Sequence, residues 1–360
     1  MTVSLPDWQD TARASAFAQW LADVAPAHGL APHTVRLASA DASFRRYFRI
    51  DAAGGSGSFI IMDAPPDKED CAPFVKVAGL MEGAGLRAPR VLAWDAPQGF
   101  MLLSDLGART MMDVIAPPAA VDAVAVPTDA HFQLYMDAAD VLVRWQLASR
   151  PGVLPPYDDA LLSRELALFP EWYVGQHRGF APDAGPRAKL APLFEQIRAN
   201  NLTALDGARV YVHRDFMPRN LMVDASGAMG VLDFQDSVYG PVTYDIASLM
   251  RDAFLSWDEE FVLDITVRYW QKARKAGLPV GDDFGEFYRA VEWMGLQRHL
   301  KVLGIFARLT LRDGKPRYLA DTQRFIKYAR ATCARYRPLG PLMVLLDEIE
   351  GNETRVGYTF

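Results

Sequence analysis

The chain has 360 residues and a net charge of -6, and half of its residues are hydrophobic. This length exceeds what one hydrophobic core usually supports, so we expect two domains. The acidic balance gives no general attraction to nucleic acid or to an anionic membrane, so any phosphate must be bound by local groups.

The amino-terminal segment has an early acidic residue and an amphipathic pattern, which is not typical of a signal peptide. No apolar run approaches the ~20 residues of a membrane-spanning helix. Cys71 and Cys333 lie far apart and fit neither a metal-binding spacing nor a disulfide framework. These features predict a soluble cytoplasmic protein, and they leave its oligomeric state open.

Short strands dominate the first hundred residues. Residues 35–64 contain β-branched and aromatic runs separated by two turn-forming clusters, which predicts three antiparallel strands. A helix is expected around residues 71–85, followed by two more strands around 90–95 and 100–107. The amino-terminal region is therefore predicted to be a sheet with one helix.

Helical patterns dominate beyond residue 107 and are interrupted by a surface loop rich in alanine and proline at 116–130. Residues 132–148 and 291–309 place apolar side chains at the three-and-four spacing of a buried helical face. The exception is the stretch 208–236, where short β-rich runs are joined by turns. This stretch carries the chemical motif of the chain.

The segment HRDFMPRN, residues 213–220, places Asp215 two residues after His213 and five before Asn220. Two short apolar strands and a turn lead from Asn220 to Asp233. A hairpin of this length brings its ends together, so the Asp233 carboxylate can approach the Asn220 amide. Phosphoryl transfer from ATP requires a base for the acceptor hydroxyl and hard oxygen ligands for Mg²⁺. The pattern predicts Asp215 as the base, with Asn220 and Asp233 holding the metal.

The order H-x-D, four residues, Asn, then D-F on the next hairpin resembles the protein-kinase-like superfamily. The segments HRDFMPRNLMV and GVLDFQD are similar to the corresponding sequences of its aminoglycoside phosphotransferase branch. The resemblance covers nearly the whole chain. It implies a bilobal α+β fold with a sheet-rich nucleotide-binding lobe at 1–105 and a mainly helical catalytic lobe at 106–360. It also implies a cleft for ATP, with adenine against the hinge backbone near Ser104 and Leu106.

The resemblance also assigns residues around the motif. Asp245 matches a family position that braces the catalytic loop, although a helix N-cap is the alternative interpretation. His213 is interpreted as a packed loop anchor rather than a titrating catalyst. Two interpretations stay open for Asp236 and Tyr239, either contacts to the substrate or turn residues before Gly240.

The chain departs from the family where a strand lysine normally pairs with the nucleotide phosphates, because Met62 stands there. The preceding loop lacks the glycines of a phosphate loop, although Ser43 and backbone amides could meet a phosphate. Arg45 and Arg46 follow directly, and we expect one of them to supply the missing charge. The alternative is that these arginines, with Arg49, form a solvated strand face.

The wording SFRRYFRI, MDAPP and GVLDFQDSVYGPVTYD most resembles the bacterial N-acetylmuramate/N-acetylglucosamine anomeric kinases, which also lack the lysine. This resemblance implies transfer of the ATP γ-phosphoryl group to the C1 hydroxyl of an N-acetylated sugar during peptidoglycan recycling. Composition and spacing alone indicate only an ATP-dependent kinase that acts on a small compound with a hydroxyl group.

The sequence leaves the substrate pocket open to several interpretations. Arg298 and Lys301, three residues apart on a predicted helix, are expected to face a substrate carboxylate, and their alternative is a solvated helix face. Glu165 and Glu171 keep a cationic acceptor possible, such as an aminoglycoside, a choline-like or a homoserine-like compound. Met62 also supports a rival class, a non-catalytic binding module on the kinase fold.

Overall fold

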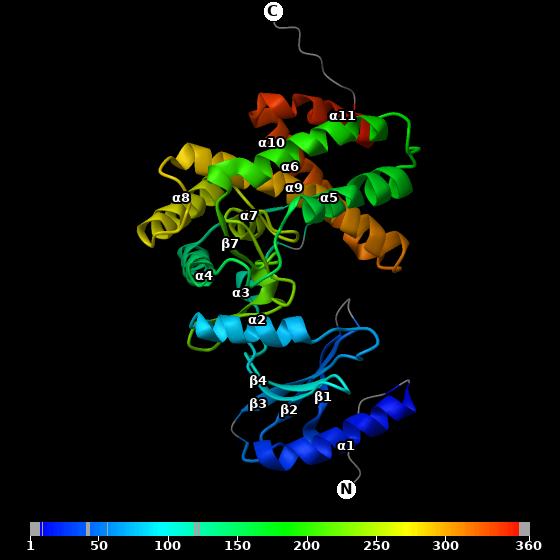
Figure 1. Cartoon of the computed structure of the whole chain (residues 1–360), viewed down its shortest axis with the longest axis vertical. Helices are drawn as coiled ribbons and strands as arrows, with labels where there is room; N and C mark the ends of the chain where they lie inside the picture. Colours follow the sequence, from blue (N-terminus) through cyan, green and yellow to red (C-terminus); the bar gives the residue numbers. More distant parts are fainter. Residues whose placement is uncertain are drawn as a thin grey trace, which may run out of the picture. The chain divides into compact units, whose positions relative to one another are not determined.

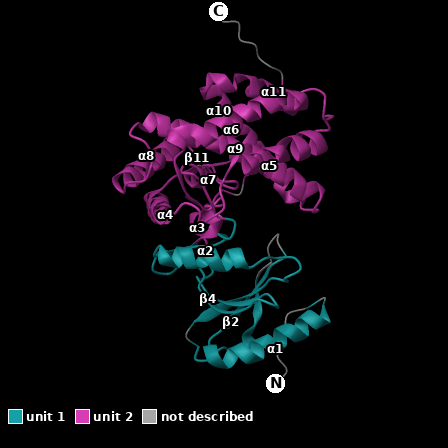
Figure 2. Cartoon of the chain, in the orientation of Figure 1, with its two compact units in different colours: residues 1–109, 222–236 teal, residues 110–221, 237–360 magenta. Residues whose placement is uncertain are grey.

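The protein is described by a computed structural model that covers residues 8, 10–40, 44–55, 57–118, 120 and 123–352. The chain forms two compact units (Figure 2). Unit 1 comprises residues 1–109 and 222–236, and unit 2 comprises residues 110–221 and 237–360. The predicted α+β class is confirmed, with the sheet-rich part at the amino terminus and the helices beyond it. The domain boundary after residue 105 stays a prediction.

A five-stranded antiparallel sheet forms the centre of unit 1, with strand order β1-β2-β3-β5-β4. The meander and the two later strands lie where the sequence predicts them. The strands are β1 (Arg36–Ala40), β2 (Arg46–Asp51), β3 (Ser58–Asp63), β4 (Val91–Asp95) and β5 (Phe100–Ser104).

Helices α1 (Thr11–His28) and α2 (Ala72–Gly83) cover the two sides of this sheet (Figure 1). Helix α1 begins where the side chain of Asp10 accepts hydrogen bonds from two backbone amides, and it packs Phe17 and Trp20 against aromatic residues of the sheet. Burying a large apolar side chain contributes about 1.5–3 kcal/mol to stability, so this face anchors the helix.

A small hairpin, β8 (Leu221–Val223) and β9 (Met229–Val231), carries the chain into the DFQ motif. Val231 donates a backbone hydrogen bond to the carbonyl of Arg87 at 2.7 Å. Arg87 also forms an ion pair with Asp224 in the hairpin turn. These contacts fix the hairpin to the amino-terminal part of unit 1.

Unit 2 is built from helices around the long helix α9 (Phe284–Leu311). Two short strands, β7 (Arg209–Val212) and β10 (Val238–Pro241), pair antiparallel beside them, and β6 (Val124–Ala125) pairs with β11 (Ser256–Trp257). The other α-helices are α3 (Met111–Ile115), α4 (Asp129–Leu147), α5 (Asp159–Leu168), α6 (Leu190–Gly207), α7 (Tyr244–Met250), α8 (Glu259–Lys275), α10 (Thr322–Arg335) and α11 (Gly340–Glu350).

Helix α9 is buried along most of its length because α5, α6, α7, α10 and the π-helix η2 (Phe169–His177) all pack against it. Its backbone approaches α5 closely at Gly304, where a Cβ atom would lie 2.4 Å from the carbonyl of Leu168. Polar side chains in the middle of this helix, such as Gln297, Arg298 and Lys301, are therefore buried. Among the described residues, no helix has the length and apolar character needed to cross a bilayer.

Candidate active site

The predicted catalytic loop, residues 213–220, lies between β7 and β8 as the sequence indicates. Its entry is held by Asp245 in the first turn of α7, whose carboxylate accepts the backbone N–H groups of His213 at 2.7 Å and Arg214 at 3.0 Å. Asp245 is fully buried. The N-cap interpretation of Asp245 is wrong, because Thr243 occupies that position and the carboxylate faces the loop. Asp245 therefore braces the backbone one and two residues before Asp215.

Burial changes the pKa of the Asp245 carboxyl. It raises this pKa to about 6, although the nearby His213 and Arg298 and the two backbone hydrogen bonds act to lower it. His213 is itself buried, its Nδ1 accepts the backbone N–H of Asp215 at 3.3 Å, and its ring packs edge-on against Phe216. These contacts are those of a loop anchor.

The backbone of the loop is strained at Arg214, which has a φ of 76°. This left-handed conformation costs a side-chain-bearing residue free energy and persists only where neighbours hold it. The Arg214 guanidinium donates to Glu165 on α5 at 2.6 Å, which adds a second fastening to the one from Asp245. The strain lies directly before Asp215, so these contacts determine how the half-buried Asp215 side chain is presented.

Glu165 is the centre of a buried network that the sequence did not reveal. It accepts from Arg214, from Lys301 at 2.9 Å and from the hydroxyl of Tyr157 at 2.5 Å. Lys301 also donates to the hydroxyl of Tyr244 at 3.1 Å. Burial alone would raise the pKa of Glu165, but the two cations and the hydrogen bonds outweigh it and lower the value to about 2. The same network raises the pKa of Lys301 to about 12, although burial opposes this.

Asn220 closes the loop. Its side-chain nitrogen donates to the backbone carbonyl of Asp215 at 2.9 Å, and the turn Pro218–Asn220 packs against α3. This bond assigns the amide nitrogen to the loop, so the amide oxygen is the atom suited to a cation. Asp215 and Asn220 are thus brought together as predicted from their spacing.

Asp233 lies just after β9 in unit 1. It is exposed and has a φ of 60°, a second left-handed residue at a predicted functional position. Gln235 donates to its carboxylate at 2.8 Å, and the neighbouring Phe234 is fully buried against Phe74 of α2. The buried ring anchors the segment while the carboxylate stays accessible.

The two residues left open by the sequence differ in setting. Asp236 is exposed in unit 1, near the end of the segment that carries Asp233. Tyr239 is half-buried on β10, where it pairs with Tyr211 of β7 and its backbone bonds to residues 155 and 157. A contact of either residue to the substrate stays a prediction.

Oxygen ligands suit the metal that the sequence predicts. Within the described ranges, no group of three or more His, Cys, Asp or Glu side chains is arranged to hold a metal ion. Mg²⁺ does not require such a cage, since it is commonly held by one or two protein oxygens together with nucleotide phosphates. That Asn220 and Asp233 supply these oxygens stays a prediction.

The arginines of unit 1 have carboxylate partners. Arg46 donates two hydrogen bonds to the fully buried Asp63, which also receives two from Arg13, and the Arg46 guanidinium lies 3.8 Å from the centre of the Trp8 ring. Arg45 pairs with Glu69 at 3.1 Å.

The interpretation of these arginines as a solvated strand face is wrong. Arg45 is buried, and Arg46 and Arg49 are half-buried in ion pairs, with Arg49 bound to Asp105 at 2.6 Å. Met62, at the place of the family lysine, is fully buried between Tyr47 and Met101 of the neighbouring strands. Ser43 lies outside the described residues. A phosphate contact from Arg45 or Arg46 stays a prediction.

The predicted hinge lies at the end of β5. Ser104 exchanges two hydrogen bonds with the backbone of Arg90, one through its amide and one through its hydroxyl. Leu106 packs against Gly230, where a Cβ atom would lie 2.9 Å from the leucine side chain. Between them, Asp105 is fixed by Arg49. The role of Ser104 and Leu106 in binding adenine stays a prediction.

Arg298 and Lys301 do not form a solvated helix face, because both are buried on α9. The physical reason is the central position of this helix, against which other helices pack. Lys301 is already bound to Glu165 and Tyr244, whereas the guanidinium of Arg298 lies 5.5 Å from the centre of the Tyr244 ring. Glu171 is exposed on η2.

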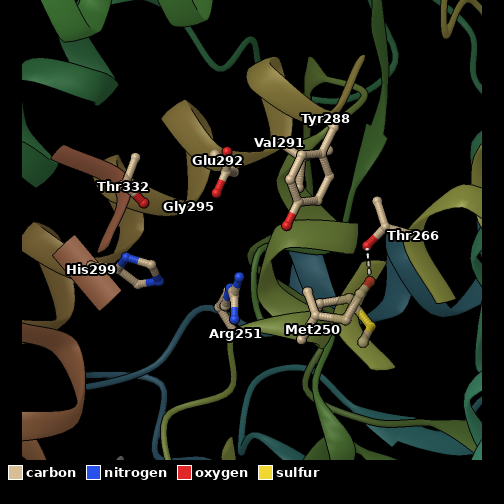
Figure 3. Close-up of a pocket in the computed structure, with 10 residues that line it drawn as sticks. Met250, Arg251, Thr266, Tyr288, Val291, Glu292, Gly295, His299 and Thr332 are labelled. Atoms are coloured by element: carbon tan, nitrogen blue, oxygen red, sulfur yellow. Dashed lines mark hydrogen bonds between the residues drawn. The ribbon is translucent and has the colours of Figure 1, made fainter. Parts of the chain in front are cut away.

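A small cavity in unit 2 is lined by residues from α7, α8, α9 and α10 (Figure 3). Its volume is about 10 Å³, which is close to the room that one water molecule needs. His299 borders it, and burial keeps the pKa of His299 well below its usual value, so the imidazole is neutral. This cavity is too small for a sugar and is not the acceptor site.

The sequence pattern that defines the phosphotransferase enzyme family matches residues 34–282. The chain belongs to this family. The match includes the loop 213–220, Asp233 and Asp245, so the braced Asp215 lies in the part of the chain that is shared with other phosphotransferases. The protein is therefore a phosphotransferase.

Two bacterial relatives of this phosphotransferase carry the same name. A protein of Pseudomonas aeruginosa called N-acetylmuramate/N-acetylglucosamine kinase is 49% identical over 312 residues, which cover 87% of each chain. A protein of Neisseria meningitidis serogroup B with that name is 47% identical over 343 residues, which cover 95% of this chain and 97% of the relative. The similarity extends beyond the family match into the C-terminal helices.

Solved structures share the fold at low identity. The choline kinase LicA from Streptococcus pneumoniae superposes with a TM-score of 0.60 at 11% identity, covering 89% of this chain and all of the other. A macrolide 2'-phosphotransferase from Brachybacterium faecium gives a TM-score of 0.56 at 16% identity, covering 85% of this chain and 98% of the other. These likenesses confirm the protein-kinase-like fold predicted from the motif order.

Proposed function

We propose that this phosphotransferase transfers the γ-phosphoryl group of ATP to the anomeric C1 hydroxyl of N-acetylmuramate and N-acetylglucosamine, in the recycling of cell-wall sugars. One observation carries the proposal. Relatives of that name are 47–49% identical over 87–95% of this chain, and the chain keeps the Asp215, Asn220 and Asp233 series. The proposal includes a cytoplasmic location, where a reducing environment keeps the buried thiols of Cys71 and Cys333 free.

Asp215 acts as the base in this proposal. Its carboxylate orients the C1 hydroxyl and takes its proton as the hydroxyl oxygen forms a bond to the γ-phosphorus. The bond between the γ-phosphorus and the bridging oxygen breaks, and ADP leaves with that oxygen. The contacts from Asp245, Glu165 and Asn220 to the loop support this role, because positioning supplies much of the rate in phosphoryl transfer.

Asn220 and Asp233 are the proposed ligands of Mg²⁺, which when bound neutralises negative charge on the nucleotide phosphates. The hydrogen bond from Asn220 to the Asp215 carbonyl supports this role, since it engages the amide nitrogen and the amide oxygen is the atom that can bind a cation. The exposure of Asp233 supports it as well, because a carboxylate must be accessible to take part in binding a hydrated cation.

The buried network argues against a polycationic acceptor. Glu165, which by sequence kept a cationic substrate possible, is bound by Lys301, Arg214 and Tyr157. The two cations compensate the charge of Glu165, so this carboxylate is not available to bind an ammonium group of an aminoglycoside.

Turnover of ATP with a panel of acceptors tests the proposal. We expect magnesium-dependent ADP formation with N-acetylglucosamine and N-acetylmuramate, and none above background with kanamycin, choline or homoserine. The Asp215→Asn variant serves as the matched control for contaminating activity. Faster turnover of any of the three amines than of either sugar would overturn the assignment.

A further inference from the structure

Arg219 places an exposed positive charge in the loop that carries Asp215. It lies in the turn Pro218–Asn220, and it forms no ion pair with a carboxylate of the residues that the structure describes. Four positions separate Arg219 from Asp215, so their Cα atoms lie within about 14 Å of each other. The loop therefore offers a cation close to the proposed base.

The ring of Phe254 holds this cation. The Arg219 guanidinium lies 3.3 Å from the centre of the ring, well within the range of a cation–π contact. Phe254 is half-buried, and the centre of its ring lies 5.9 Å from that of Phe306 on α9. Its backbone N–H donates to the buried Asp252 at 2.7 Å. The ring is thus fixed to the helical core, and it restricts the position of the guanidinium.

This contact leaves the hydrogen-bond donors of Arg219 free. A separation of 3.3 Å requires the flat guanidinium to lie along the face of the ring, because an edge-on group would bring its nitrogen atoms too close. The N–H donors lie in the plane of the guanidinium and therefore point away from the ring. Two parallel donors match the two oxygens of a carboxylate. The arrangement is suited to an oxyanion.

The charges around Arg219 support an anionic ligand. Burial raises the pKa of Asp252, and three arginines oppose this effect, namely Arg219, Arg298 and Arg324. Asp321, whose pKa Arg219 and Arg324 also act to lower, lies 3.8 Å from Arg324. Each of the two carboxylates already has a partner within the chain. Three cations and two carboxylates leave an excess of positive charge, which favours an anion.

We propose that Arg219 binds the lactyl carboxylate of N-acetylmuramate, an inference that rests on the proposed function. N-acetylmuramate differs from N-acetylglucosamine by a lactyl ether on O3, whose carboxylate is the only charged group of the sugar. Arg298 and Lys301, which the sequence suggested for a substrate carboxylate, are only 5% and 8% exposed. Arg219 is exposed and lies on the loop of the proposed base, so it takes their place in this proposal.

The two sugars test the proposal because they differ only where Arg219 would bind. Arg219→Met removes the charge and keeps much of the length of the side chain. The measurement is kcat/KM for both sugars and for N-acetylmuramate with its carboxylate converted to a carboxamide. We expect the variant to lose about tenfold more kcat/KM for N-acetylmuramate than for N-acetylglucosamine, as a hydrogen bond between charged groups is lost. For the carboxamide, the additional loss should largely disappear.

The outcomes separate this inference from the proposed function. If the unmodified protein phosphorylates neither sugar, the proposed function fails and this inference falls with it. If it phosphorylates both, an equal loss for the two sugars in Arg219→Met would assign Arg219 to the transferred phosphoryl group or to the loop, and would overturn the inference. No loss for either sugar would overturn it as well. Phosphorylation of N-acetylglucosamine alone would leave a sugar kinase that recognises no carboxylate.

Matched variants complete the experiment. Arg289→Met removes another exposed arginine that lies over a ring, 5.3 Å from the centre of the Trp293 ring, and it should leave the ratio of kcat/KM for the two sugars unchanged. Phe254→Leu should shift this ratio in the same direction as Arg219→Met but less, because the charge stays and the ring that holds it is lost. If thermal unfolding shows that Arg219→Met does not fold, Phe254→Leu and Arg219→Lys decide the question. An unchanged ratio in both would refute the inference.

Discussion

The loop 213–220 of unit 2 and the DFQ segment of unit 1 each contain a carboxylate with a proposed role in phosphoryl transfer and one residue with a left-handed backbone, but the two segments are held in different ways. Arg214 and Asp233 both have left-handed backbones. The loop is held by hydrogen bonds from buried carboxylates, those of Asp245 and Glu165, to its backbone and side chain. The segment is anchored by a buried ring, that of Phe234, while Asp233 stays exposed. A base needs a fixed direction, whereas a metal ligand needs access.

The largest effect should come from removing the fixed base. Asp215→Asn should retain nucleotide binding but lower turnover by about 10²- to 10⁴-fold, because proton acceptance is lost. Single-turnover assays beside ATP titrations measure both properties. Near-normal turnover in a folded Asp215→Asn variant would remove Asp215 from the mechanism.

Removing the exposed carboxylate of Asp233 should have a smaller effect. Asp233→Ala should weaken magnesium-dependent nucleotide binding by more than about tenfold, since the cation loses an anionic oxygen ligand. Asn220→Ala should weaken it less. Titrations with and without Mg²⁺ measure the difference, and Gln235→Ala controls for loss of the neighbouring hydrogen bond. Unchanged binding in Asp233→Ala would make this residue structural.

The ion pairs of Glu165 should make the free energy of unfolding depend on pH. The pKa of Glu165 is lowered from 4.5 to about 2, so its ion pairs stabilise the fold fully above pH 4.5 and lose this contribution as the pH falls toward 2. Glu165→Gln leaves two buried cations uncompensated, which should cost about 3 kcal/mol at pH 7.

Denaturant unfolding at pH 7 and at pH 3 measures this contribution. The difference between Glu165→Gln and the unmodified protein should shrink at the lower pH. Glu195→Gln, which alters an exposed ion pair with Arg198, is the matched control and should show a small difference at both pH values. A Glu165 difference that stays constant with pH would refute the assigned charge network.

Substitutions of the arginines of unit 1 should have the smallest effects, and Arg45 and Arg46 should affect different properties. Arg46→Met removes hydrogen bonds to the buried Asp63, so it should lower the free energy of unfolding by about 1–3 kcal/mol. Arg45→Met should instead raise the KM for ATP if Arg45 supplies charge to the phosphates. An unchanged KM for ATP in both variants would discard a phosphate role for either arginine.

The sequence predicted the parts of the site whose residues lie close together in the chain. The H-x-D, Asn and D-F order indicated the kinase-like fold and brought Asp215 and Asn220 together, because both lie on one short loop. Glu165 was interpreted only as an acid that could meet a cationic acceptor, since nothing nearby in sequence shows that Arg214 and Lys301, 49 and more than 100 residues away, bind it. Long-range pairs of this kind depend on helix packing.

The polar residues of α9 show a second limit. The three-and-four spacing of its apolar residues predicted one buried face, with Arg298 and Lys301 facing either a substrate carboxylate or solvent. In the structure, helices pack around α9, and Arg298, His299 and Lys301 are all buried. A helix with long apolar residues on either side of its charged positions, as in GLQRHLKVLG, carries the signal that could have indicated full burial.

The site of phosphorylation on the sugar tests the central claim most directly. A phosphate on C1 abolishes the reducing end of the sugar, whereas a phosphate on C6 leaves it intact. We predict that reducing-sugar reactivity disappears in step with ATP consumption for both N-acetylglucosamine and N-acetylmuramate. Full reducing reactivity after complete consumption of ATP would contradict the account.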